Sequence, residues 1–154
     1  MEDLKLIIND YLKTQKLMSV ATYGDYPWIA NLYFVHDENL NLYFLSSHWR
    51  EHCEAIKKNN KVAVAITDSH QPFRSPQVGI QMHGTAKEVN MVTKLKWMFE
   101  MWNKLIAGDD GEKLTDPKKF LEAGRSKVYK ITPKRIKFFN TGLWPEEQTK
   151  VLDL

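Results

Sequence analysis

Residues 28–52, WIANLYFVHDENLNLYFLSSHWREH, contain two apolar segments on either side of a polar turn. Alternation over residues 27–35 is typical of a β-strand with two different faces. The polar run His36-Asp-Glu-Asn39 indicates a hairpin turn, after which residues 42–47 continue as the returning strand. A short helix is predicted next, over residues 48–59. The stretch therefore predicts a hairpin whose second strand leads into the beginning of a helix.

The same patterns predict further strands and helices along the rest of the chain. The continuous apolar run at 62–66 predicts a strand buried on both faces. Gly79 and Gly84 are expected at β-bulges or points of close approach. The other predicted strands are 17–23, 78–89, 127–131 and 135–139, and the other predicted helices are 2–14, 91–106 capped by Asn90, and one from Asp116-Pro117 to Gly124. Six or seven strands with segregated helices favour a mainly β barrel over a doubly wound sheet.

Length and composition limit the class of protein. The 154 residues, 43% hydrophobic and 27% charged, predict one globular domain over residues 1–154. No apolar run reaches the length of a membrane span, and the acidic start does not resemble a signal peptide, so we expect a cytoplasmic protein. The single Cys53 excludes an intrachain disulfide. The net charge of +3 comes from scattered basic residues, which argues against nucleic-acid binding.

The end of the strand at 42–47 carries a candidate phosphate site. Ser46 and Ser47 provide hydroxyl donors, and Arg50 and His52 follow in or near the first helical turn. A helix N-terminus adds free backbone N–H groups and the positive end of the helix dipole. In the alternative interpretation, Ser47 is an ordinary N-cap and Arg50 pairs with Glu54.

Other kinds of chemistry find little support in the sequence. The five histidines are scattered and Cys53 has no partner cysteine, so no metal site is predicted. We find no Ser-His-Asp order, no paired carboxylates, no P-loop and no glycine-rich dinucleotide motif. The many aromatic residues fit either a core with a dimer interface or stacking against a planar cofactor.

The order of these segments resembles the pyridoxamine 5′-phosphate oxidase-like FMN-binding split barrels, over residues 4–144. The matching pieces are Trp28–Asp37, Leu42–Ser47, Ile56–Val64 and Val78–Glu88. Within that superfamily the chain is most similar to the small YhbP-like group. The features shared with this group are a Trp-x-Ala-Asn hairpin and the residues His52, Gly79, Gln81, Gly84 and Trp144.

The resemblance implies a six-stranded antiparallel split β-barrel with Greek-key connections and flanking helices. It also implies a homodimer with two FMN molecules at the subunit interface. The strand backbone at Ala30, Asn31, Leu32 and Tyr33 would face the edge of the isoalloxazine ring. Leu45, Ser46, Ser47, Arg50 and His52 would hold the ribityl phosphate, Gln81 would reach the flavin or its phosphate, and Trp144 or Phe139 would come from the other subunit.

Two departures from the family pattern affect the expected function. The oxidases have an Arg-Lys pair where this chain has Glu51 and His52, and Arg50 lies one residue early. The helical region 90–124 is longer than a plain barrel needs, and the basic substrate residues of the oxidases have no match. We therefore expect an FMN-dependent oxidoreductase acting on a small molecule other than pyridoxamine phosphate. The alternatives are a flavin-binding or stress-related protein without turnover, and a split barrel that binds haem or another ligand through His52 or His83.

Overall fold

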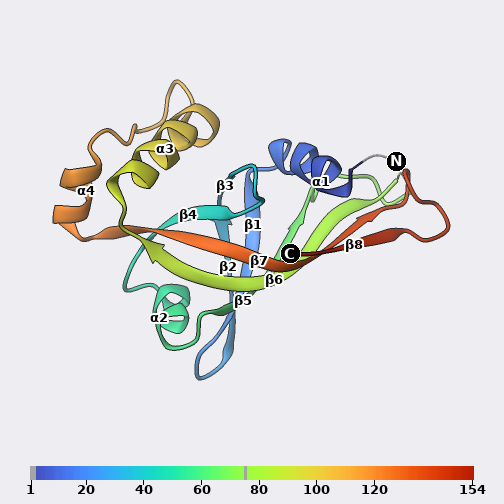
Figure 1. Cartoon of the computed structure of the whole chain (residues 1–154), viewed down its shortest axis with the longest axis horizontal. Helices are drawn as coiled ribbons and strands as arrows, with labels where there is room; N and C mark the ends of the chain where they lie inside the picture. Colours follow the sequence, from blue (N-terminus) through green and yellow to red (C-terminus); the bar gives the residue numbers. More distant parts are fainter. Residues whose placement is uncertain (1–2, 75) are drawn as a thin grey trace.

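The computed structural model describes residues 3–74 and 76–154, whose path is shown in Figure 1. Within them the backbone forms one antiparallel sheet of eight strands with helices around it. The strands are β1 (Leu17–Tyr23), β2 (Pro27–Tyr33), β3 (Val35–His36), β4 (Leu42–Ser47), β5 (Lys61–Thr67), β6 (Val78–Val89), β7 (Ser126–Asn140) and β8 (Thr149–Asp153). The helices are α1 (Leu4–Lys13), α2 (Glu51–Lys58), α3 (Val92–Trp102), the π-helical turn η1 (Asn103–Ala107) and α4 (Pro117–Ala123). No helix in these two ranges is long and apolar enough to span a membrane.

The sheet curls into a half-barrel. Its strands follow the order β2-β1-β5-β6-β7-β4-β3, and β8 pairs with β7 beyond the end of β4. The long pair β6 and β7 curves across the whole molecule, with α3 and α4 at one end and β8 at the other (Figure 1). The curl allows β2 and β4, which are not paired with each other, to line the same cleft. The mainly β class with antiparallel strands and flanking helices is confirmed.

The predicted count of six strands is wrong, because the sheet has eight. Residues 127–131 and 135–139 form the single strand β7, which passes through Thr132-Pro133 without turning. Pro133 lies where the pairing with β6 shifts register, between His83 and Gly84. A bulge tolerates proline because the residue at that position does not need to donate a hydrogen bond to the neighbouring strand. The short β8 was not predicted, since its sequence TKVLD alternates only weakly.

The predicted hairpin is only partly correct. Residues 27–35 do not form one strand, because β2 ends at Tyr33 and pairs with β1. The partner of β4 in the hairpin is the two-residue strand β3. Asp37 holds the turn between them, since one carboxylate oxygen accepts hydrogen bonds from the backbone N–H groups of Asn39 and Asn41. The turn therefore lies where the polar run predicted it, but the strand that leads into it is β3 rather than one strand over residues 27–35.

The prediction that residues 62–66 are buried on both faces is also wrong. In β5 the side chains of Val62, Val64 and Ile66 are buried, whereas Ala63 and Ala65 are exposed. A run of small and branched apolar residues does not distinguish a doubly covered strand from one with alanines on an open face. On its outer face β5 therefore exposes the small side chains of Ala63 and Ala65.

The helices form close to where the sequence predicts them. Asp116 caps α4 through hydrogen bonds from the N–H groups of Lys118 and Lys119, and Gly124 ends the helix with a left-handed φ of 65°. The helix predicted over 91–106 is observed as α3 followed by η1, and its N-cap is Met91 rather than Asn90. The helix predicted over 48–59 begins later, at Glu51.

Two groups of buried apolar side chains meet along β4. The larger one lies inside the curled sheet and includes Phe44 and Phe138. The smaller one includes Tyr43 and packs the region of α3 and α4 against β4 and β7. Neighbouring side chains on a strand point to opposite faces, so Phe44 and Tyr43 enter different groups. Burial on both faces fixes β4 firmly, and with it the residues at its end.

Close packing of the long β6–β7 pair depends on two glycines. A Cβ on Gly84 would lie 2.1 Å from the backbone oxygen of Thr132, and one on Gly79 would lie 2.3 Å from the Phe139 ring. Both distances are far inside van der Waals contact. The prediction of close approach at Gly79 and Gly84 is confirmed, and the bulge lies at Gly84.

Replacing Thr22 by valine is expected to stabilise the protein. Thr22 is only 3% exposed, and among the described residues its Oγ1 is buried without a hydrogen-bond partner. Valine keeps the branched shape and removes that unpaired group, so the free energy of unfolding should rise by about 1 kcal/mol. Urea denaturation measures the change, with Thr22→Ser, which keeps the hydroxyl, as the control. A less stable Thr22→Val variant would show that this hydroxyl has a partner.

Candidate functional site

A cleft of about 460 Å³ lies where β2 approaches the end of β4. It brings together segments that are distant in the sequence: the middle of β2, the end of β4, the beginning of α2 and the first residue of β7. Eight residues predicted for a cofactor line it, namely Ala30, Asn31, Leu32, Leu45, Ser46, Ser47, Arg50 and His52. Glu51 and Ser126 complete the lining. The cleft is the place in the fold where the predicted donors converge.

Ser46 and His52 form a hydrogen-bonded pair in this cleft. Ser46 Oγ lies 2.8 Å from His52 Nε2, and the His52 residue is only 7% exposed. Its ring packs beside Phe44, with 6.1 Å between the ring centroids. When Nε2 carries the proton, His52 donates to Ser46 Oγ and leaves the hydroxyl proton free to point into the cleft. His52 thereby orients a donor at the end of β4.

The pKa of His52 is held below its ordinary value of 6.5. Burial of the imidazole is the main cause, and the positive charge of Arg50 adds to it, while Glu51 acts in the opposite direction. The neutral form is therefore favoured at neutral pH. A neutral imidazole can hold the Ser46 hydroxyl without adding a second cation beside Arg50.

The first backbone N–H groups of α2 have no hydrogen-bond partner within the helix. Arg50 is the N-cap residue, and within residues 3–74 and 76–154 no side-chain cap hydrogen bond is made to the first turn. Ser47 is therefore not the N-cap, and its backbone oxygen instead accepts a hydrogen bond from the Arg50 N–H at 3.1 Å. No ion pair between Arg50 and Glu54 occurs among the described residues. The alternative of a plain cap and helix pair is therefore wrong.

Glu51 places a carboxylate in the same cleft. It is the first residue of α2, where the helix dipole favours a negative charge, and its side chain is exposed. An anionic ligand in the cleft would meet this charge as well as that of Arg50. Glu51 occupies one of the two positions at which the sequence departs from the oxidase pattern, so this departure lies within the site.

The strand β2 forms the opposite wall. Asn31 has its side-chain oxygen 2.7 Å from Ser19 Oγ of β1, which donates a hydrogen bond to it. Ala30 and Leu32 line the cleft beside it. Tyr33 does not line the cleft, and its side chain is 49% exposed.

The other predicted residues lie elsewhere in the chain. Gln81 sits in the middle of β6, where it pairs with Ala65 and Lys137 on the exposed side of the sheet. Trp144 packs edge-on against Phe138, with ring centroids 5.9 Å apart, at the border of the larger core. Phe139 covers Gly79. Within one chain these residues are not part of the cleft.

Sequence reasoning missed Ser126 as a lining residue. Ser126 begins β7 and pairs directly with Ser47, which brings a third serine to the end of β4. Nothing in residues 42–52 identifies this partner strand, which starts more than seventy residues later. Only the pairing of β4 with β7 places Ser126 in the cleft.

The curled antiparallel sheet, split at the cleft between β2 and β4, is the split-barrel fold of the pyridoxamine 5′-phosphate oxidase-like proteins. No protein-family model matches the sequence, and no curated protein is similar to it. Among solved structures, the chain is similar to general stress protein 26 of Bacillus anthracis strain Sterne. The TM-score is 0.70 at 20% identity, over 98% of each chain.

Two structures from Clostridium acetobutylicum are also similar. One is a protein of the pyridoxinephosphate oxidase family related to general stress protein 26 of Bacillus subtilis, with a TM-score of 0.65, 15% identity, and coverage of 100% of this chain and 97% of the other. The second is a NimC/NimA family protein, with a TM-score of 0.65, 15% identity, and coverage of 97% and 92%. The TM-scores show a shared fold, and at these identities the similarity shows the fold alone.

Stability is expected to fall as the pH is lowered through the titration range of the buried histidines. The pKa values of His52 and His36 are both lowered, mainly by burial. Below their ordinary value of 6.5 the unfolded chain therefore binds more protons than the folded chain, and protonation favours unfolding. The stabilisation is fully present above this pH and is lost as the pH falls through the folded-state pKa values.

Urea denaturation between about pH 7.5 and about pH 5 measures this effect. His52→Gln should flatten the decline, because it removes one of the two groups. His70→Gln is the matched control, since that side chain is 94% exposed. An equal decline in wild type and His52→Gln would contradict the assignment.

Proposed function

We propose that the chain binds FMN in the cleft between β2 and β4, as a homodimer, and works as a flavin-dependent oxidoreductase. The observation that carries the proposal is the convergence of Ser46, Ser47, Arg50 and the beginning of α2 in one cleft. Each of these groups donates hydrogen bonds or carries positive charge. The split-barrel fold supports the same proposal.

The chemistry of the donors fits a terminal phosphate. Two serine hydroxyls and a guanidinium can each donate to phosphate oxygens, and Arg50 can do so through two N–H groups. The unpaired N–H groups at the beginning of α2 add the partial positive charge of the helix dipole. Glu51 opposes this charge, so we expect weaker binding than a site with a second cation would give.

The wall formed by β2 suits the flat part of the cofactor. Ala30 and Leu32 present small and apolar side chains, and strand backbone can donate to the polar edge of a ring. Bound FMN would supply hydride or electron transfer, while the chain would bind, orient and shield it. We assign no catalytic acid or base to the chain.

A second copy of the chain is the proposed cover for the exposed outer face of the sheet. Ile29 and Tyr33 of β2 are 66% and 49% exposed on this face, which continues across β1 to the exposed Ala63 and Ala65 of β5. A monomer seldom exposes such an apolar strip to water. This face adjoins the cleft, because Ala30 and Leu32 belong to the same strand. A second copy there would also place Gln81 at the interface.

The absorbance spectrum of the purified protein tests the cofactor. Bound flavin gives a yellow protein that releases a compound with the mass of FMN on denaturation. Protein isolated without flavin should take up added FMN to one equivalent per chain. A colourless protein that does not bind added FMN would refute the proposal.

Sedimentation of the FMN-loaded protein tests the assembly. We expect a dimer, and Ile29→Asp should weaken it by placing charges on the outer face. Leu154→Asp, a change at a terminal position that is also more than half exposed, should leave the dimer intact. A monomer with full flavin occupancy would contradict the shared interface.

Turnover is tested by the oxidation of NADH or NADPH by the loaded protein. A saturable rate above that of free FMN supports the oxidoreductase. Bound FMN without such a rate favours a flavin-binding protein, a possibility raised by the fold shared with a general stress protein. Added haem should cause no spectral shift, and a shift would favour haem binding through His52, which is hydrogen-bonded to Ser46, or through the exposed His83.

A further inference from the structure

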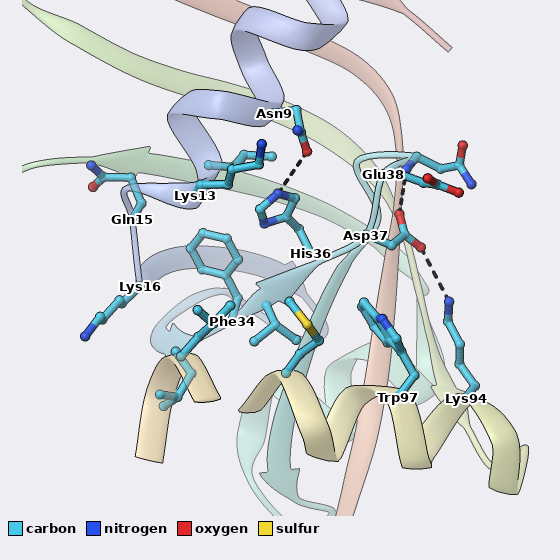
Figure 2. A pocket seen from close by; sticks show the side chains of 16 residues that line it. Asn9, Lys13, Gln15, Lys16, Phe34, His36, Asp37, Glu38, Lys94 and Trp97 are labelled. Atoms are coloured by element: carbon cyan, nitrogen blue, oxygen red, sulfur yellow. Dashed lines mark hydrogen bonds and ion pairs between the residues drawn. The ribbon is translucent and has the colours of Figure 1, made fainter. Parts of the chain in front are cut away.

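A second pocket of about 580 Å³ lies apart from the cleft, and its lining shares no residue with that of the cleft. It is formed by α1, the β3 turn and the helical region of α3 and η1 (Figure 2). Phe34 comes from the larger apolar core, whereas Trp97, Met101 and Ile106 border the smaller one. The pocket is thus a gap at the junction of the two cores. Its volume is in the range of small-molecule sites.

The floor of this pocket is apolar and partly aromatic. Trp97 provides a half-buried ring and Met101 a half-buried, adaptable thioether, whereas Phe34 is only 2% exposed. Leu105, on η1, is 39% exposed although it lines the pocket. A π-helical turn at the end of an α-helix is uncommon, and such turns are frequent at functional sites. These side chains offer an unfilled apolar surface to a flat ligand.

The polar groups are arranged asymmetrically around that floor. Figure 2 shows Lys13 and Lys16 on one side of the pocket and Lys94 with Asp37 on the other. Lys94 is already occupied, because its Nζ lies 3.6 Å from Asp37 and 4.5 Å from the centre of the Trp97 ring. The Asp37 carboxylate is also saturated, since it accepts hydrogen bonds from Tyr43 Oη and from Asn41.

The positive charge that remains available to a ligand is therefore that of Lys16. Among the described residues, the side chain of Lys16 takes part in no ion pair or hydrogen bond, whereas Lys13 pairs with the exposed Asp10 at 2.9 Å. His36 lies between the two sides, with Nε2 at 3.1 Å from Asn9 Oδ1. Glu38 is the one further carboxylate in the lining, and it is exposed on the turn.

We propose that this pocket is a second ligand site, which binds a small aromatic carboxylate. The ring would lie against Trp97, Met101 and Leu105, and the carboxylate would face Lys16, which is unpaired among the described residues. A purely aliphatic or neutral ligand would use only part of this arrangement. The site goes beyond the proposed FMN function, since nothing in it touches the cleft.

Titration calorimetry of the full-length protein with naphthoate tests the site. We expect one equivalent to bind per chain, and the neutral amide of the same ring to bind at least about five-fold more weakly. Leu105→Glu, which adds a like charge to the pocket wall, should weaken naphthoate binding by about ten-fold or more. Leu154→Glu makes the same change at an exposed position outside the pocket and should have no effect.

Two further measurements keep the test independent of folding and of flavin. Lys16→Gln changes an exposed side chain, so it should fold normally and weaken naphthoate binding by about three-fold. Saturating FMN should leave naphthoate binding unchanged. Equal affinities for naphthoate in wild type, Leu105→Glu and Lys16→Gln, equal binding of the amide, or competition by FMN would each overturn the proposal. The outcomes of the variants and of the amide leave FMN binding to the cleft untouched, whereas competition by FMN would place both ligands at one site.

Discussion

Phe44→Ala is expected to lower the free energy of unfolding by about 3–5 kcal/mol, which is a large share of the stability of a domain of this size. Phe44 is fully buried in the larger core. Its ring stacks on Tyr129, with centroids 5.0 Å apart and an interplanar angle of 12°. Truncation removes this contact and leaves a cavity that the rigid sheet cannot close. Urea denaturation monitored by circular dichroism measures the loss.

The same substitution should also weaken FMN binding, because Phe44 packs beside His52. Loosening of the imidazole would release Ser46, which it holds at 2.8 Å. Phe44→Leu should cost less than about 1.5 kcal/mol, since it nearly conserves the buried volume. Phe73→Ala is the surface control and should change stability by less than about 0.5 kcal/mol, because Phe73 is 87% exposed. A loss of less than about 1 kcal/mol for Phe44→Ala would contradict this account of the core.

Arg50→Ala is expected to weaken FMN binding by about 1.5–3 kcal/mol if the guanidinium pairs with the phosphate. Arg50 lines the cleft beside Ser46 and Ser47, and no ion pair within the described part of the chain engages it. Its charge is therefore available to a ligand. Fluorescence titration of the flavin-free protein with FMN measures the change in affinity.

Substitutions on the same helix provide the controls for Arg50. Lys58→Ala removes an equal charge at the other end of α2 and should leave FMN affinity nearly unchanged. Glu51→Gln should tighten binding, because it removes the carboxylate from the cleft. Unchanged FMN affinity in Arg50→Ala, together with normal stability, would show that the phosphate does not bind at this helix. Opposite effects of Arg50→Ala and Glu51→Gln would locate the phosphate between these two side chains.

The candidate site was predictable to the extent that it is local in sequence. The order strand, two serines, helix in residues 42–58 places Ser46, Ser47, Arg50 and His52 within a few residues of each other, so any fold that keeps this order brings them together. The hydrogen bond between Ser46 and His52 was not predictable, because it depends on the direction in which α2 leaves the end of β4. Ser126 was missed because strand pairing, rather than local sequence, places it there.

Local patterns alone determined the mainly β class, the positions of most helices and strands, and the close approaches at Gly79 and Gly84. These features depend on periodicity, caps and backbone geometry, which act over a few residues. Tertiary structure decided the rest: the continuity of β7 through Pro133, the addition of β8, and the open face of β5. It also decided which of the eleven predicted residues share a cleft, and it left Tyr33, Gln81 and Trp144 outside it. The physical reason is that sheet curl and pairing are long-range interactions, in which each strand depends on neighbours far away in the chain.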